Sequence, residues 1–217
     1  MSLQLTNQTL SISGHEFSIE FPSSQDQLLE HALRGEDAVN WHADPYWGLL
    51  WDAAPKTAAM ILSQEWPTSL KVLDLGCGVG LTGLAALQAG HQVTFADHAT
   101  MAVEMAISNA ALNGFPETPG LVFDWQSPPS ATFEFIIASD ILYDVASHAS
   151  LLFTLQSMLS DQGTVWIGDI GRPNALRFAK LAIACGWDLQ SLDEVAKPRP
   201  EPGHMQFRLL VLHRRSD

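Results

Sequence analysis

The chain contains 217 residues, of which 47% are hydrophobic and 16% are charged. This composition supplies enough apolar side chain for one domain with a real core, and it argues against an intrinsically disordered chain. The 11 Lys and Arg residues, set against 24 Asp and Glu residues, give a net charge of −13. Because a nucleic-acid-binding protein usually presents a basic face, we expect no nucleic-acid partner.

The cysteines, histidines and apolar runs argue against three further classes of protein. Cys77 and Cys185 lie far apart in the sequence, which suits neither a disulfide framework nor a zinc site. The eight His residues belong to no HExxH or paired-cysteine motif, so we expect no metal site. The sequence begins without a charged-then-apolar leader, and no apolar run approaches the ~18 residues of a membrane span. We therefore expect a cytoplasmic protein without a membrane partner.

The first part of the sequence predicts a hairpin followed by two helices. Apolar and polar residues alternate over 8–21 about Ser13-Gly14, which is typical of a β-hairpin. Periodic leucines predict a helix over 26–33. An aromatic-rich stretch follows at 41–51, and a second helix is predicted over 53–64.

From residue 71 onward, strands and helices alternate. Short apolar runs predict strands at 72–75, 91–96, 121–123, 133–138 and 164–167. Helical periodicity predicts helices at 81–89, 99–112, 147–159 and 175–184. Such alternation implies a parallel sheet that helices cover on both faces.

The end of the chain departs from this alternation. Strands are predicted at 187–195 and 205–213 with only a Pro-rich loop between them, so they should pair antiparallel. The sequence thus predicts an α/β fold, with a doubly wound, mostly parallel seven-stranded sheet that ends in an antiparallel C-terminal hairpin. We assign residues 1–40 to an N-terminal extension of hairpin and helix, and residues 41–217 to the main domain.

A glycine-rich turn links the first strand of the alternating region to its helix. It reads Gly76-Cys77-Gly78-Val79-Gly80. Glycine permits positive φ and close approach of a ligand to the backbone, and the following helix offers free N–H groups to an anion. Either a dinucleotide, through Gly78-x-Gly80-x-x-Gly83, or S-adenosylmethionine could bind here, and the spacing leaves both open.

Acidic residues near this turn favour S-adenosylmethionine. Asp74 precedes the glycines, where a carboxylate could accept hydrogen bonds from an ammonium group but would repel a pyrophosphate. Asp97 ends the second strand, where it could accept both ribose hydroxyls. Asp124 and Trp125 follow the third strand, and they offer a hydrogen-bond acceptor and a flat apolar surface to an adenine.

With these motifs, the chain resembles the seven-strand (class I) S-adenosylmethionine-dependent methyltransferases. The segment 72–80 resembles their first motif, and the resemblance runs from about Asp44 to the C-terminus. The segments 46–54 and 139–143, with Asp124-Trp125, more narrowly resemble the methyltransferase-like group that contains many protein-lysine methyltransferases. The segment 139–143 matches that group's Asp-x-x-Tyr signature, formed here by Asp140 and Tyr143.

The resemblance implies roles for particular residues. Those that would line the cofactor are Trp51, Gly76, Gly78, Asp97, Trp125 and Ser139, to which the residue patterns above add Asp74, Gly80 and Asp124. Asp140 and Tyr143 would be the catalytic pair at the mouth where the methyl group leaves. We further expect Asp140, with Asp144, to capture and orient the acceptor, and Tyr143 to form a wall or a hydrogen-bond partner.

The resemblance therefore implies an enzyme that methylates a protein lysine with S-adenosylmethionine as cofactor. Three alternatives stay open on the sequence. They are a methyltransferase that acts on the nitrogen or oxygen of a small molecule, an NAD-dependent oxidoreductase, and a binding module that has lost catalysis.

Overall fold

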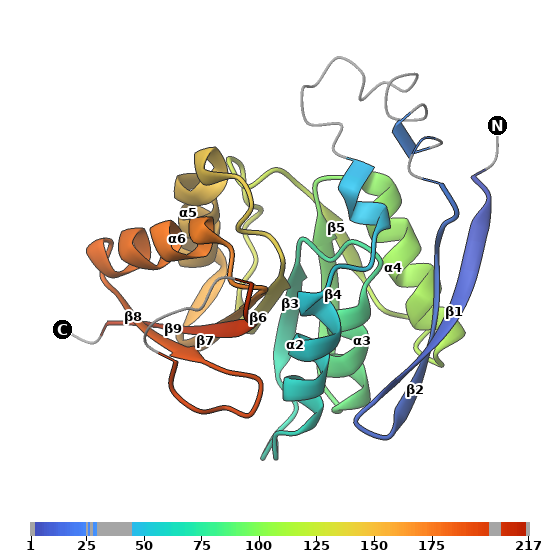
Figure 1. The fold of residues 1–217 in the computed structure, drawn as a ribbon, viewed down its shortest axis with the longest axis horizontal. Coiled ribbons are helices and arrows are strands. Elements are labelled where there is room, and N and C mark those ends of the chain that lie inside the picture. The colour runs from blue at the N-terminus through green and yellow to red at the C-terminus, as the bar shows by residue number, and fades with distance from the viewer. Residues whose placement is uncertain (1–2, 25, 27, 30–44, 200–204, 216–217) are drawn as a thin grey trace.

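A computed structural model of the chain describes residues 3–24, 26, 28–29, 45–199 and 205–215 (Figure 1). Most of the helix expected over 26–33, and the beginning of the aromatic stretch at 41–44, lie outside the described residues. The boundary that we placed at residue 40 also lies outside them, so the division into an extension and a main domain stays a prediction.

The centre of the fold is a seven-stranded sheet with the order β5-β4-β3-β6-β7-β9-β8. Its strands are β3 (Lys71–Leu75), β4 (Gln92–Asp97), β5 (Gly120–Val122), β6 (Phe133–Ser139), β7 (Leu159–Asp169), β8 (Trp187–Leu192) and β9 (Arg208–Arg214). Strands β3 to β7 pair in parallel, and β9 lies antiparallel between β7 and β8. The predicted sheet and its antiparallel C-terminal hairpin are confirmed.

Helices cover both faces of the sheet, as Figure 1 shows. They are α2 (Ala53–Leu62), α3 (Leu81–Gln88), α4 (Thr100–Leu112), α5 (His148–Met158) and α6 (Pro173–Ala184). Apolar side chains of α2, α3 and α4 pack on one face, and those of α5 and α6 pack on the other. The central strands are buried on both faces, which explains their continuous apolar sequences.

An N-terminal hairpin packs beside α4, outside the main sheet (Figure 1). Its strands β1 (Leu5–Ile12) and β2 (His15–Pro22) pair antiparallel, as predicted. Ser13 and Gly14 form the turn with φ of 50° and 83°, and two positive φ values match the right-handed twist of a hairpin. Phe17 and Ile19 of β2 are buried in the core that α3 and α4 share.

The strands near the C-terminus differ in length from the prediction. Strand β7 begins at Leu159, directly after α5, whereas we expected it at 164. Strand β8 ends at Leu192 rather than at 195, because the Asp193 carboxylate accepts hydrogen bonds from Val195 N and Lys197 N and closes a turn. The start of β9 lies at Arg208 rather than at 205.

Candidate active site

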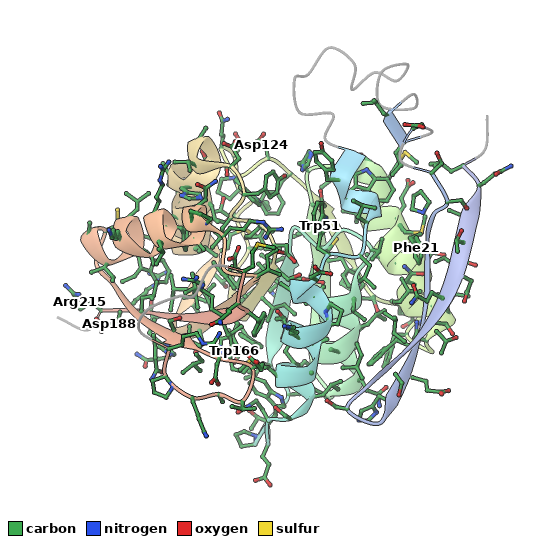
Figure 2. All side chains as sticks on the ribbon, viewed as in Figure 1. Phe21, Trp51, Asp124, Trp166, Asp188 and Arg215 are labelled. Carbon is green, nitrogen blue, oxygen red and sulfur yellow. The ribbon has the colours of Figure 1, made fainter. Side chains whose placement is uncertain are left out.

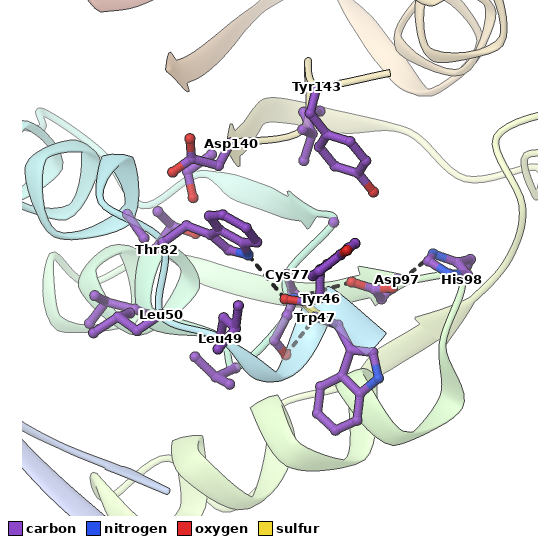
Figure 3. Close-up of a pocket in the computed structure, with 18 of the residues that line it drawn as sticks. Tyr46, Trp47, Leu49, Leu50, Cys77, Thr82, Asp97, His98, Asp140 and Tyr143 are labelled. Carbon is purple, nitrogen blue, oxygen red and sulfur yellow. Dashed lines mark hydrogen bonds and ion pairs between the residues drawn. The ribbon is translucent and has the colours of Figure 1, made fainter. Parts of the chain in front are cut away.

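A pocket of about 750 Å³, including space open to solvent, lies at the carboxyl ends of β3, β4 and β6. Its walls are the glycine turn after β3, the ends of β4 and β6, and the segment 46–54, which we call the strap. Figure 3 shows Asp97 and His98 on one side of this pocket and Asp140 on another. Ligands of open α/β sheets bind at the carboxyl ends of the strands, at the point where the strand order of the sheet reverses.

The glycine turn presents free N–H groups to the pocket. Gly76 and Gly78 have φ of 68° and 51° and line the pocket, as predicted. Within the described residues, the N–H groups of Val79, Leu81 and Thr82 donate no hydrogen bond, and all three residues line the pocket. Such groups at a helix N-terminus form a binding site for a carboxylate or phosphate.

Gly80 supports this turn from behind rather than lining the pocket. It is the left-handed N-cap of α3, with φ of 88°. A Cβ atom at this position would lie 2.9 Å from the Cβ of Ala106 and 3.1 Å from Cε1 of Phe95. Close packing between α3, α4 and β4 therefore requires glycine here, and the expected contact of Gly80 with the cofactor stays a prediction.

Asp74 also lies behind the turn, and its predicted contact with an ammonium group stays a prediction. Its side chain is 0% exposed and is not part of the pocket wall. The carboxylate accepts hydrogen bonds of 2.8 Å from the Thr82 hydroxyl and of 2.8 Å from Gly83 N. Burial raises the pKa of Asp74 to about 7, against the lowering effect of these two hydrogen bonds. Its carboxyl group therefore fixes the first turn of α3.

Asp97 lines the pocket at the end of β4, as predicted. Its carboxylate accepts hydrogen bonds from Gly78 N at 3.1 Å and from Ala99 N at 3.1 Å, and Nδ1 of His98 lies 3.2 Å away. This side chain thus ties the glycine turn to the start of α4. It is the one carboxylate of the pocket wall that stands beside the turn.

Asp124 and Trp125 lie just beyond β5, and the structure brings only Trp125 to the pocket. Trp125 lines the wall, and its carbonyl accepts a hydrogen bond from the Thr154 hydroxyl at 2.8 Å. Asp124 is exposed and does not line the pocket, because its carboxylate accepts a hydrogen bond from Gln126 N at 2.7 Å and closes a local turn. The expected contact between Asp124 and an adenine stays a prediction.

The strap crosses the pocket above the glycine turn. It includes a short 3₁₀ helix, η2 (Pro45–Gly48), and Nε1 of Trp51 donates a hydrogen bond of 3.0 Å to the Tyr46 carbonyl. The Trp47 carbonyl oxygen lies 2.9 Å from the position of a Cβ atom on Gly78, so only glycine fits beneath the strap. Trp51 lines the pocket as predicted, and Trp47, which sequence reasoning missed, lies in the wall as well.

Asp140 lines the pocket at the end of β6, but both of its carboxylate oxygens are already bonded. One oxygen accepts a hydrogen bond of 2.8 Å from Ala53 N at the start of α2, and the other forms an ion pair with Arg172. Its side chain is 2% exposed, and burial raises its pKa while Arg172 opposes that rise. Asp140 therefore holds the strap and α2 in place, and the expectation that it captures the acceptor stays a prediction.

Arg172 is a residue of the mouth that sequence reasoning missed. Its guanidinium pairs with Asp140 and lies 3.3 Å from the buried carboxylate of Asp169, and it stands 5.7 Å from the centre of the Trp51 ring. The signal was an arginine just beyond the fifth strand of the alternating region, in Asp169-Ile170-Gly171-Arg172.

Three further residues were predicted to lie near the cofactor or the acceptor, namely Ser139, Tyr143 and Asp144. Ser139 and Tyr143 line the pocket, as predicted, and the Tyr143 side chain is 48% exposed. The Tyr143 carbonyl accepts a hydrogen bond from Nδ2 of Asn174, which anchors this loop to α6. Asp144 lies outside the pocket wall, and its carboxylate accepts a hydrogen bond from Ala146 N as the cap of the short helix η3 (Val145–Ser147).

A family described as lysine methyltransferase matches residues 43–176, which is more than half of the chain. This chain belongs to the lysine methyltransferase family. The predicted resemblance to S-adenosylmethionine-dependent methyltransferases is therefore confirmed. Family membership also favours that cofactor over the dinucleotide that the glycine spacing had left open.

Two curated proteins illustrate how this family member compares with its relatives. The electron transfer flavoprotein beta subunit lysine methyltransferase of Mus musculus is 34% identical over 142 residues, covering 64% of this chain and 56% of the mouse protein. The protein of the same name from Homo sapiens is 31% identical over 142 residues, covering 64% of this chain and 54% of the human protein. The chain thus spans just over half the length of these relatives.

A solved structure confirms the methyltransferase fold. The ribosomal protein L11 methylase of Lactobacillus delbrueckii subsp. bulgaricus superposes with a TM-score of 0.61 at 20% identity, covering 77% of this chain and 81% of that chain. At this identity the likeness shows the fold alone. Within the residues that the structure describes, no helix is long and apolar enough to cross a membrane, and no three His, Cys, Asp or Glu side chains are grouped to hold a metal ion.

Proposed function

We propose that this member of the lysine methyltransferase family transfers the methyl group of S-adenosylmethionine to the side-chain amine of a lysine in a protein substrate. The proposal is carried by one combined observation, namely that a chain matching this family has a pocket over the glycine turn. The free N–H groups of Val79, Leu81 and Thr82 suit the carboxylate of the methionine part. When bound, S-adenosylmethionine supplies an electrophilic methyl group.

The pocket offers one residue for each further part of this cofactor. Asp97 stands where a carboxylate can accept hydrogen bonds from ribose hydroxyls, and the Trp125 ring offers an apolar face for the adenine. Gly76 and Gly78 leave the backbone bare beneath Trp51 and the rest of the strap. Ser139 completes the wall at the end of β6. These residues fit the cofactor that the family implies.

The mouth is suited to a neutral amine that enters between aromatic side chains. A free lysine has a pKa of about 10.4, so its ammonium group must lose a proton before it can attack a methyl group. Trp51 and Tyr143 line the entrance, and apolar surroundings lower the pKa of an amine. Because the oxygens of Asp140 are bonded to Ala53 N and Arg172, we propose that the proton passes to solvent.

Titration calorimetry tests the cofactor. We expect the chain to bind S-adenosylmethionine and its demethylated product S-adenosylhomocysteine, and not NAD. The variant Asp97→Ala should weaken binding of both by at least tenfold, because it removes the ribose acceptor and the bond to Gly78 N. Asp124→Ala, which changes a carboxylate outside the pocket, is the matched control and should bind as the parent does. Binding of NAD alone would overturn the proposal, and unchanged binding by Asp97→Ala would overturn the ribose assignment.

A labelled methyl donor tests the acceptor. Because the curated relatives are named as methyltransferases of the electron transfer flavoprotein beta subunit, we propose that subunit as the first substrate to examine. Label should enter the protein and should be lost when the acceptor lysine is changed to arginine. Cell extract serves as the broader substrate pool. Label confined to small metabolites would instead favour a small-molecule methyltransferase.

We also propose a cytoplasmic location, since Cys77 and Cys185 are both free thiols and no membrane partner is expected. Cell fractionation tests this proposal, and recovery of the chain in an organelle would contradict it.

A further inference from the structure

Two asparagines of α4 hold the N-terminal hairpin by its backbone. Asn113 accepts a hydrogen bond of 2.9 Å from Ser18 N and donates one of 2.7 Å to Ser18 O. Asn109, one helical turn earlier, accepts one of 2.8 Å from Glu20 N and donates one of 2.9 Å to Glu20 O. Each amide thus pairs with β2 as a neighbouring strand would. Side chains four residues apart lie on the same face of a helix, so both reach the same edge.

Asn109 differs from Asn113 in one further bond. Its Nδ2 also donates a hydrogen bond of 2.9 Å to the carbonyl of Val79, and its side chain is 0% exposed. Val79 lies in the glycine turn and lines the pocket. One buried amide therefore joins the β2 backbone to the turn proposed to hold the cofactor.

The hydrogen bond to Val79 acts on a peptide unit that lies between two glycines of the turn. Gly78 and Gly80, on either side of Val79, have φ of 51° and 88°. Glycine adopts positive and negative φ with similar ease, so side chains do not fix these peptide planes. The N–H group of this peptide unit, on Gly80, donates a hydrogen bond of 2.8 Å to Cys77 O, and Asn109 holds the carbonyl of the same unit on Val79. Asn109 thus helps to fix the orientation from which the free N–H groups of Leu81 and Thr82 follow.

We propose that Asn109 is a positioning residue for the glycine turn, through which the docked β1–β2 hairpin strengthens cofactor binding. The inference rests on the proposed function only in that S-adenosylmethionine is the ligand. Loss of the bond to Val79 should raise the KM for S-adenosylmethionine and leave kcat nearly unchanged, because the mouth at Asp140 and Tyr143 is not altered.

The variant Asn109→Asp tests this proposal, with Asn113→Asp as the matched control. Each aspartate keeps the acceptor for β2 and loses an amide that donates twice, to Glu20 O and Val79 O in one case and to Ser18 O and Asn109 O in the other. We expect Asn109→Asp to raise the Kd for S-adenosylhomocysteine about tenfold. Asn113→Asp should change it less than twofold. Thermal unfolding of both variants provides the comparison of stability.

Equal Kd values for folded Asn109→Asp and the parent would overturn the proposal, as would equal losses in the two variants. Asn109→Ala removes the same donors without adding a charge, should Asn109→Asp fail to fold. Hydrogen exchange on the unaltered chain gives a second test, because coupling between sites is reciprocal. Saturating S-adenosylhomocysteine should slow exchange at Glu20 N more than at Ser18 N, and equal or absent slowing would also overturn the proposal. Failure of the unaltered chain to bind S-adenosylhomocysteine would instead overturn the proposed function.

Discussion

The carboxyl group of Asp74 occupies a fully buried position beneath the glycine turn, where it binds the Thr82 hydroxyl and Gly83 N. A Cβ atom at Gly83 would lie 2.8 Å from this carboxylate and 2.3 Å from the Phe95 ring. The neighbouring side chains and backbone thus pack closely around this carboxyl group. Removal from water is therefore the main cause of the raised pKa of about 7.

This pKa predicts that the chain loses stability as the pH rises from about 4 to 7. The folded state keeps a proton on Asp74 up to about pH 7, whereas an unfolded aspartate releases it near pH 3.9. The free energy of unfolding should therefore fall between about pH 4 and 7, by at most about 1.4 kcal/mol per pH unit from this group. Asp74→Asn cannot ionise and should reduce that slope, as urea unfolding at several pH values would reveal.

Asp188→Asn is the control for this measurement, since Asp188 lies on the surface beside Arg215, far from the pocket (Figure 2). It should leave the slope as it is in the parent. An Asp74→Asn variant whose stability varies with pH as steeply as that of the parent would contradict the prediction.

At the scale of elements, Arg172 joins four parts of the site. Asp140 and Asp169 end β6 and β7, Asp140 binds the first N–H of α2, and the guanidinium faces Trp51 of the strap. Asp140 and Asp169 are both buried. Asp140 pairs with this cation, whereas Asp169 also lies opposite Arg208 of β9 and accepts hydrogen bonds from Gly171 N and Arg172 N. The planar guanidinium can bind two carboxylates at once, which a lysine ammonium does less well.

Arg172→Ala should lower the free energy of unfolding by about 3–5 kcal/mol, because it leaves the buried carboxylate of Asp140 without its cation. Arg172→Lys should lose less. In the Arg172→Ala background, Asp140→Asn should recover part of the loss, since an amide carries no charge and still accepts a hydrogen bond from Ala53 N. Urea unfolding measures all three variants.

Arg215→Ala provides the matched control for Arg172. Arg215 pairs with Asp188 at 3.2 Å, and both side chains are more than half exposed. Solvent-exposed ion pairs contribute about 0–1 kcal/mol. If Arg172→Ala were no more destabilising than Arg215→Ala, the role assigned to the buried cluster would be wrong.

At the scale of the whole molecule, the alternation of strands and helices predicted the sheet and its C-terminal hairpin. Each central strand must be apolar on both faces, and each helix must be apolar on one. The local spacing of apolar residues therefore predicts the layers of the fold. The ends of β7, β8 and β9 were predicted less well. A side chain such as that of Asp193 ends a strand by hydrogen bonds that leave no periodic trace in the sequence.

The residues of the pocket were likewise predicted only in part. Gly76, Gly78, Asp97 and Trp125 lie in its wall as predicted, because the carboxyl ends of parallel strands share one edge of the sheet. Asp74 and Asp124 also lie near the ends of strands in the sequence. Their carboxylates, however, accept hydrogen bonds from nearby backbone N–H groups, and their side chains do not reach the pocket. The roles of Arg172 and Asn109 were not predicted, because their hydrogen-bond partners lie up to 89 residues away in the sequence.

The sequence by itself determined the order of the layers, the glycine turn and the family to which the chain belongs, because these depend on neighbours in the chain. Only the tertiary structure decided which carboxylates face the pocket, what Asp140 binds and how the hairpin reaches Val79. These features arise where segments distant in sequence compete for the same hydrogen-bonding groups. Burial makes an unsatisfied group costly, so the outcome is set by packing of the whole fold.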